Sequence, residues 1–199
     1  MLLKRLFDFS VAIILLMVFS PLILILVLLV YLFMGRPIFF IQTRAGHFGN
    51  PFRIYKFRTM SNEVDCNNIL MSDNERITKL GALLRSSSLD ELPNLANVLI
   101  GNMSLVGPRP LYTHYNQLYS SYQCMRLAVR PGITGLAQIK GRNALTWSQK
   151  FRYDVWYVKN WSFCLDLKII FLTIGAVAKR YGVNSPQNTI VEEFKGGEG

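Results

Sequence analysis

The sequence contains few of the residues from which metal centres and disulfide frameworks are built. Its 199 residues include three cysteines and two histidines, and no two cysteines form a Cys-x-x-Cys pair. Cys66, Cys124 and Cys164 are scattered and odd in number, so neither a zinc site nor a disulfide framework is predicted. The polar part of the chain is therefore expected in a reducing, cytosolic compartment. His47 and His114 are isolated and do not predict a site by themselves.

Acidic residues are also scarce. Twelve Asp and Glu face 22 Lys and Arg, which gives a formal net charge of +10. This surplus favours an anionic partner, such as a nucleotide, a lipid phosphate, a membrane surface or nucleic acid. No internal repeat or low-complexity segment is present, and the length fits one domain plus an appendage.

The longest apolar stretch lies at the N-terminus. Residues 6–34 carry a single charged side chain, Asp8. The stretch exceeds the ~20 residues needed to cross a bilayer and is too long for the apolar part of a signal peptide, so it predicts a membrane-inserted segment. Because Asp8 follows Lys4 and Arg5 by about one helical turn, we expect an ion pair at the interface rather than a functional acid.

Pro21 follows Ser20 near the middle of this stretch. The proline removes the hydrogen bond to the carbonyl of Met17, and the Ser20 hydroxyl offers a partner to a freed backbone group. Basic residues flank the stretch on both sides, which favours two cytoplasmic ends. From the residues alone two interpretations stay open: a kinked spanning helix, and a re-entrant helix that returns to the side it entered.

Asp90 and Glu91 stand where a helix over residues 89–99 is expected to begin. One interpretation is structural: Ser88 and Glu91 form a capping box, and Asp90 suits the positive end of the helix dipole. The other is functional, because arginines precede and follow the pair. A carboxylate set among arginines suits chemistry on a phosphorylated anion.

Several basic residues lie in a strand or in rigid turns. The alternation in residues 52–60 predicts a half-buried strand, from which Lys56 and Arg58 either face solvent or contact a phosphate. Prolines on both sides hold Arg109 in one place, as a guanidinium that binds phosphate requires. A glycine beside Arg142 permits close approach of a ligand.

The C-terminal half is expected to be mainly helical. The predicted helices cover residues 77–85, 112–126 and 163–180, residues 147–161 are dense in aromatics, and residues 130–138 are expected to be turn-rich and then extended. Residues 163–180 suit either a core helix or a helix in the membrane interface. Arg126 and Arg130 are expected to face anionic lipid.

Four segments carry a family resemblance when they are taken together. They are residues 56–60, 89–93, 103–110 and 130–143. In this order they resemble the bacterial sugar transferases, and among these the small monotopic phosphoglycosyl transferases, over residues 4–183. Residues 157–160 and 163–182 make the chain most similar to enzymes that transfer phospho-N,N′-diacetylbacillosamine in glycoprotein assembly.

The resemblance implies an α+β fold that is mainly helical. Residues 1–36 would form a re-entrant membrane helix with a break at Ser20 and Pro21. Residues 37–183 would form a compact cytosolic catalytic domain with a few short strands and interfacial amphipathic helices, and residues 184–199 a loose tail.

The resemblance also implies a reaction. A UDP-sugar, such as UDP-N,N′-diacetylbacillosamine or another N-acetylated sugar, would donate its sugar 1-phosphate to undecaprenyl phosphate and release UMP. This would be the first membrane step of glycoprotein or surface polysaccharide assembly, at the cytoplasmic face of the bacterial inner membrane. Further expected partners are anionic membrane lipid and a homodimer or downstream glycosyltransferases. The alternative is a membrane-tethered basic module that binds anionic partners, although no nucleic-acid-binding fold is recognised.

The implied site centres on the acidic pair. Asp90 would be the nucleophile, and Glu91 would hold Mg²⁺, with the division of metal binding between them left open. A carboxylate nucleophile predicts ping-pong kinetics. The expected phosphate-binding residues are Arg85, Arg109 and Arg142, with Lys56 and Arg58 next.

Overall fold

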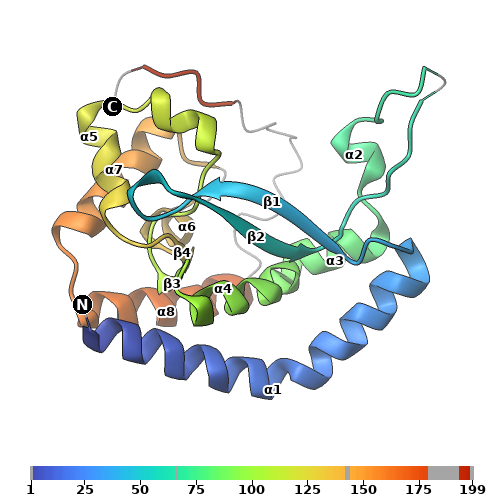
Figure 1. Ribbon diagram of the computed structural model, residues 1–199, viewed down its shortest axis with the longest axis horizontal. Coiled ribbons are helices and arrows are strands. Elements are labelled where there is room, and N and C mark those ends of the chain that lie inside the picture. Colours follow the sequence, from blue (N-terminus) through green and yellow to red (C-terminus); the bar gives the residue numbers. More distant parts are fainter. Residues whose placement is uncertain (1, 66, 142–143, 179–192, 198–199) are drawn as a thin grey trace.

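A single long helix, α1 (Leu2–Met34), runs along one side of the molecule (Figure 1). The computed structural model describes residues 2–65, 67–141, 144–178 and 193–197. Among these residues α1 is the one helix long and apolar enough to cross a membrane, and little of it is buried. Figure 1 shows α1 bent near its middle. Pro21 lies inside the helix, and the hydroxyl of the preceding Ser20 donates to the Met17 carbonyl at 2.8 Å. The predicted apolar helix is confirmed.

Both halves of α1 pack against the rest of the protein. Ala12 in the first half is fully buried in the main core, and Val30 in the second half is fully buried beside Phe57. At one end Lys4 pairs with Asp166 at 2.5 Å. At the other end, a guanidinium nitrogen of Arg58 donates to the carbonyl of Met34. Residues at both ends of the helix therefore contact the same body.

The predicted ion pair of Asp8 with Lys4 or Arg5 is wrong. Asp8 is buried and accepts hydrogen bonds from the Ser104 hydroxyl and the Leu105 amide. The two basic residues have other partners, because Lys4 pairs with Asp166 and Arg5 donates to carbonyls at the end of α4 (Leu95–Ile100).

Two small sheets accompany the helices. Strands β1 (Phe39–Ala45) and β2 (Pro51–Phe57) form an antiparallel hairpin around η1 (His47–Gly49), with Gln42 opposite Ile54. Ile54 and Phe57 point into the core, which confirms the predicted half-buried strand. Strands β3 (Ser104–Val106) and β4 (Gly132–Thr134) pair in parallel.

The remaining elements are helical and mostly short. They are α2 (Asp73–Arg76), α3 (Lys79–Ser87), η2 (Leu89–Asn94), η3 (Thr113–Gln117), α5 (Ser121–Cys124), η4 (Met125–Ala128), α6 (Leu136–Lys140), α7 (Trp147–Lys159) and α8 (Phe163–Ala178). The α+β fold with mainly helical content is confirmed. The single helix predicted over residues 112–126 is wrong, since Ser120 caps a new helix there. The extended chain predicted within residues 130–138 is confirmed at β4 (Gly132–Thr134), but it ends earlier than expected because α6 begins at Leu136.

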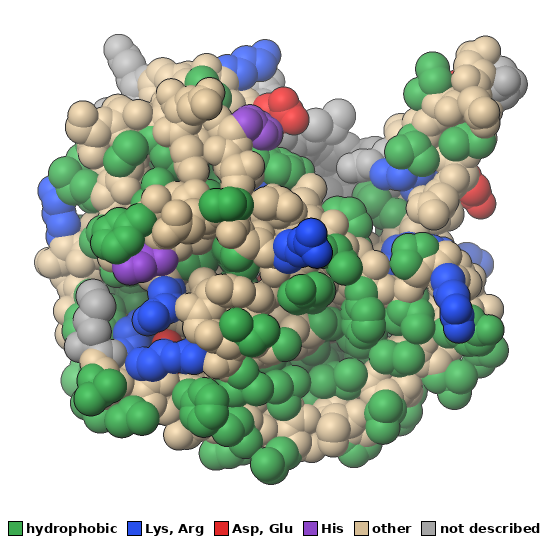
Figure 2. Space-filling view, in the orientation of Figure 1, with side chains coloured by type: hydrophobic (Ala, Val, Ile, Leu, Met, Phe, Trp, Pro, Cys, Tyr) green, Lys and Arg blue, Asp and Glu red, His purple; other side chains and the backbone are tan. Residues whose placement is uncertain are grey.

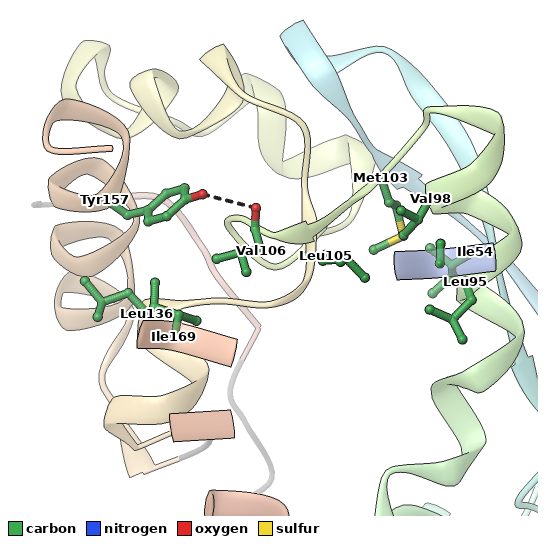
Figure 3. Close-up of a cluster of buried hydrophobic side chains, with 10 residues drawn as sticks. Ile54, Leu95, Val98, Met103, Leu105, Val106, Leu136, Tyr157 and Ile169 are labelled. Atoms are coloured by element: carbon green, nitrogen blue, oxygen red, sulfur yellow. Dashed lines mark hydrogen bonds between the residues drawn. The ribbon is translucent and has the colours of Figure 1, made fainter. Parts of the chain in front are cut away.

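The main core joins α1, β2, α4 and β3 to the three last helices (Figure 3). The Tyr157 hydroxyl donates to the Val106 carbonyl at 3.1 Å and so links α7 to β3, as the dashed line in Figure 3 marks. Helix α8 is in part a core helix, because Ile169 is fully buried, whereas Phe171 on the same helix is 81% exposed. Its location in the membrane interface stays a prediction.

A second, aromatic cluster lies around Tyr115 and Phe151. Phe194 inserts into it with its ring 5.0 Å from that of Phe151, and its amide donates to the Tyr115 hydroxyl at 3.2 Å. The loose tail predicted for residues 184–199 is therefore wrong for Phe194, which is buried. A single aromatic side chain is enough to bury this part of the chain, although the segment as a whole contains few apolar residues.

Candidate active site

The acidic pair lies on a short 3-10 turn instead of at the start of a regular helix. Ser88 adopts a left-handed backbone conformation (φ 58°), and its N–H donates to the Arg85 carbonyl, which ends α3. The Ser88 side chain caps nothing in η2. The capping box predicted for Ser88 and Glu91 is therefore wrong, and the Glu91 carboxylate turns toward basic residues of other elements.

Glu91 is held by two cations. Its Oε1 accepts from Nζ of Lys56 at 2.6 Å and from Nη2 of Arg109 at 2.9 Å. Burial alone would raise the pKa of Glu91, but the charges of Arg109 and Lys56 outweigh it and lower the pKa to about 2. Glu91 is thus ionised at neutral pH. Both contacts use Oε1, and no described residue bonds Oε2.

Asp90 has the opposite electrostatic character. It is buried, and burial together with the adjacent Glu91 raises its pKa against the opposing charges of Lys56, Arg109 and Arg85. None of the described residues donates a hydrogen bond to its carboxylate. Two neighbouring carboxylates whose pKa values are pushed apart are suited to different roles. Asp90 is the more basic of the two carboxylates, and no described residue occupies its oxygens with a hydrogen bond.

Two asparagines fix η2 against the hairpin that carries Lys56. Oδ1 of Asn94 accepts from the Tyr55 amide at 2.9 Å, and Nδ2 of Asn97 donates to the Arg53 carbonyl at 2.9 Å. Both side chains are buried. Because these bonds satisfy backbone groups of β2, they set the register in which Lys56 reaches the acidic pair.

Arg109 is positioned by a close crossing of backbones. A Cβ on Gly107 would lie 2.4 Å from the carbonyl oxygen of Arg130, and one on Gly135 would lie 2.2 Å from that of Gly107. Only glycine permits this approach. The Gly107 amide donates to the Thr134 carbonyl at 2.9 Å, so the loop that carries Arg109 is anchored to β4.

Arg126 holds the backbone of Arg109 in place. Its Nη2 donates to the Arg109 carbonyl at 2.6 Å and to Asp154 at 2.9 Å. The prediction that Arg126 faces lipid is wrong, because the side chain is buried and paired with a carboxylate. Arg130 is exposed and donates to the Gly101 carbonyl.

The sequence was compared with those of known protein families and proteins. The sequence profile described as bacterial sugar transferase matches residues 1–180. Over 196 residues the chain is 52% identical to the sugar transferase EpsL of Bacillus subtilis, covering 98% of this chain and 97% of that one. The protein belongs to the bacterial sugar transferases. The resemblance drawn from the four segments is confirmed at this level, and this sugar transferase is an enzyme.

Two further relatives differ in how much of their own length the chain covers. The sugar transferase is 40% identical to the exopolysaccharide production protein ExoY of Rhizobium meliloti, over 90% of this chain and 87% of that one. It is 44% identical to the UDP-glucose:undecaprenyl-phosphate glucose-1-phosphate transferase of Klebsiella pneumoniae, over 87% of this chain but 40% of that longer protein. The matched part of the longer relative is therefore about the size of the present chain.

Sequence analysis missed two cations of the transferase that lie near Arg109. Arg44 stacks on Tyr112, with its guanidinium carbon 3.7 Å from the ring centre. Burial lowers the pKa of both Arg44 and Lys150, and the charge of Arg109 lowers each further. Figure 2 shows Lys and Arg side chains gathered around a few acidic atoms on the left of the view. The only sequence signal for Arg44 was its place at the end of the first strand.

The other predicted phosphate-binding residues have different surroundings. Nε of Arg85 donates to the Thr59 hydroxyl at 2.9 Å, and its charge acts on Asp90. Arg58 lies at the end of α1 beside Met34, apart from the contacts that hold the acidic pair. Arg142 lies outside the described residues. The structure therefore brings Lys56, Arg85 and Arg109 to the acidic pair.

The acidic pair could hold a metal only as part of a small site. Among the described residues no group of three or more His, Cys, Asp or Glu is close enough to hold a metal. Mg²⁺ needs no such cage, since it takes one or two carboxylates and fills its remaining positions with water and substrate phosphates. The carboxylate of Asp90 and Oε2 of Glu91 fit this requirement.

Proposed function

We propose that this sugar transferase moves a sugar 1-phosphate from a UDP-sugar to undecaprenyl phosphate and releases UMP, through a covalent intermediate on Asp90. The observation that carries the proposal is the contrast within the acidic pair. Glu91 is neutralised by Lys56 and Arg109, whereas the buried Asp90 carboxylate is free of hydrogen bonds from described residues. The two substrates are proposed by analogy with the relative from Klebsiella, which is a UDP-glucose:undecaprenyl-phosphate glucose-1-phosphate transferase.

The transfer has two steps. A carboxylate oxygen of Asp90 forms a bond to the sugar-bearing phosphorus while the bond to UMP breaks, and UMP leaves with the electron pair. A phosphate oxygen of undecaprenyl phosphate then attacks the same phosphorus, which frees Asp90 and yields a polyprenyl diphosphate sugar. The charges of Lys56, Arg85 and Arg109 offset the repulsion between a carboxylate and a diphosphate. Two successive displacements at one nucleophile give ping-pong kinetics.

Mg²⁺ belongs to this proposal. Asp90 and Oε2 of Glu91 would hold it, while Lys56 and Arg109 keep Oε1 of Glu91 fixed. When bound, the ion supplies positive charge to the diphosphate oxygens.

We further propose that α1 is re-entrant and that the catalytic body lies at the cytoplasmic face of the bacterial inner membrane. The support is that both ends of α1 contact one body, through Lys4 with Asp166 and through Arg58 with Met34. A helix that crossed the bilayer would place its ends on opposite sides. The bend in α1, which contains Pro21 near its middle, allows the return.

The proposal also covers the identity of the transferred sugar. We retain N,N′-diacetylbacillosamine, or another N-acetylated sugar, as the group transferred. Relatives carry names with UDP-glucose and UDP-galactose, which define the competing donors. UMP release from a panel of these UDP-sugars tests the choice, because a preference for UDP-glucose or UDP-galactose contradicts it.

The reaction is tested with purified full-length protein in detergent, a UDP-sugar that it accepts and Mg²⁺, without acceptor. We expect UMP release equivalent to one site and a phosphosugar adduct that maps to Asp90 by mass spectrometry. Asp90→Asn should form no adduct and still bind the UDP-sugar, whereas Glu63→Gln, an exposed carboxylate control, should behave as wild type.

Two outcomes contradict the mechanism. One is an adduct on another residue, and the other is UMP release only when donor and acceptor are both present. Binding of UDP-sugar with no UMP release under any condition instead supports the basic binding module.

A further inference from the structure

A groove lies between α6, α7 and α8, away from the acidic pair. Its volume is about 450 Å³, within the range of cavities that hold small ligands. Apolar side chains line its depth, and Leu136 and Ile169 among them are buried. Lys140, Arg152 and Lys168 also line it, and each of these is exposed. The groove therefore combines an apolar interior with a basic mouth.

No acidic residue of the groove lining balances the positive charge of its mouth. None of the residues that line the groove is Asp or Glu. Lys140, Arg152 and Lys168 form no ion pair with any residue that the structure describes. Three unpaired cations around an apolar cavity are complementary to an amphiphile with an anionic head and a hydrocarbon chain.

One wall of the groove is formed by a helix that also contacts the part of the protein that enters the membrane. Helix α8, which forms one wall, contacts the N-terminal half of α1 through an edge-on pair of rings, Phe7 and Phe163, 5.0 Å apart. Further along α8, Phe171 and Ile174 expose apolar side chains. Trp156 lines the groove and is half exposed, as expected of tryptophan at the headgroup level.

The cations of the groove differ from those of the active site. The positive charges that act most strongly on Asp90 belong to Lys56, Arg109 and Arg85, and none of these lines the groove. An acceptor whose single phosphate must reach Asp90 does not also place that phosphate at the mouth of the groove. This step rests on the proposed function, and it favours an ordinary membrane lipid as the occupant.

We propose that the groove is a binding site for one anionic membrane phospholipid, with an acyl chain against Leu136 and Ile169 and the headgroup phosphate among Lys140, Arg152 and Lys168. A lipid held there joins α6, α7 and α8 to the bilayer. Strand β3, which leads to Arg109, contacts α8 and accepts a hydrogen bond from Tyr157 of α7. The lipid therefore fixes the depth of Arg109 and, through the pair that Arg109 forms with Glu91, the depth of the acidic pair.

The first test needs no variant. Full-length protein is reconstituted in nanodiscs that contain phosphatidylglycerol with a photoactivatable group on its acyl chain, and crosslinked peptides are mapped. We expect labelled peptides from α6, α7 and α8 as well as from α1. Labelling confined to α1 overturns the proposal.

The second test measures lipid retention by native mass spectrometry in detergent. The triple variant with Lys140→Gln, Arg152→Gln and Lys168→Gln should lose bound phosphatidylglycerol about 10-fold or more relative to wild type. A matched triple variant at exposed lysines (Lys79→Gln, Lys159→Gln, Lys195→Gln) removes the same charge and should retain the lipid. Equal retention in the two triple variants contradicts the site.

Competition identifies the occupant. Added undecaprenyl phosphate should leave phosphatidylglycerol in place, and its displacement of the phospholipid assigns the groove to the acceptor chain instead. Phosphatidylcholine should be retained less well, because it has no net negative charge. The readouts are lipid mass and crosslink position, so a failure here is separate from a failure of UMP release.

Discussion

The carboxylate of Asp8 accepts a hydrogen bond of 2.8 Å from the hydroxyl of Ser104. Asp8 lies in the membrane helix, and Ser104 begins β3, the strand that leads to Gly107 and Arg109. The other carboxylate oxygen accepts from the Leu105 amide at 3.2 Å. An acid within an apolar helix thus joins that helix to the strand on which the active-site arginine depends.

Asp8→Ala should therefore destabilise the protein and reduce its activity. The change leaves the buried Leu105 amide without its acceptor, at about 1–3 kcal/mol, whereas the Ser104 hydroxyl keeps the Val106 carbonyl at 3.0 Å. We expect a lower Tm in detergent together with slower UMP release. Ser104→Ala should cost less, because the Leu105 amide keeps its acceptor, and the exposed Ser10→Ala should leave Tm unchanged. Equal Tm values for Asp8→Ala and Ser10→Ala would contradict this role.

Arg126→Met should be among the most damaging substitutions outside the acidic pair. It leaves the buried Asp154 carboxylate without its partner, which costs about 3–5 kcal/mol. The exposed Arg130→Met serves as the control and should change Tm little. Combining Arg126→Met with Asp154→Leu should recover part of the lost stability, because the double variant has no unpaired buried charge at this pair of positions. UMP release should stay low in the double variant, since the Arg109 carbonyl has still lost its donor.

The rate of adduct formation should depend on the ionisation of Asp90. Its pKa is raised in the folded protein, first by burial and then by the charge of Glu91. The rate should therefore fall as the pH drops through a pKa above the ordinary value for aspartate. Glu91→Gln removes the raising charge and leaves Lys56 and Arg109 to act on Asp90, so the acidic limb should move to lower pH. Single-turnover UMP release across pH measures the shift, and a move to higher pH would refute the assignment.

Gly107→Ala should disturb the loop that carries Arg109. The added methyl would lie 2.4 Å from the carbonyl oxygen of Arg130, which is a backbone atom and not the end of a flexible side chain. We expect a loss of both Tm and UMP release. Gly175→Ala in α8 is the matched control, because nothing lies within 4 Å of the added methyl. Alanine there should be neutral or stabilise the helix by up to about 1 kcal/mol. A harmless Gly107→Ala would show that the crossing is not required.

Elements with a local signal were predictable from the sequence. The long apolar helix, the strand within residues 52–60 and the proline-flanked Arg109 each depend on a pattern within a few residues. The capping box failed because the partners of Glu91, Lys56 and Arg109, come from distant segments and bind a carboxylate more strongly than a backbone amide does.

Burial of charge was the other source of error. Arg126 is buried because Asp154 and the Arg109 carbonyl lie beside it, and neither contact leaves a trace in local composition. Asp8 is likewise buried by strand β3, which follows nearly one hundred residues later in the chain. Phe194 shows the same limit, since its aromatic partners lie far away in the sequence.

The contacts along α1 mean that the membrane segment is not a detachable anchor. Ala12 and Val30 are part of the cores on which the elements of the candidate site pack, and a shortened protein that began after the helix would expose those cores to water. A water-soluble form of the enzyme would have to keep the inner face of α1 and replace the outward-facing leucines and phenylalanines with polar residues.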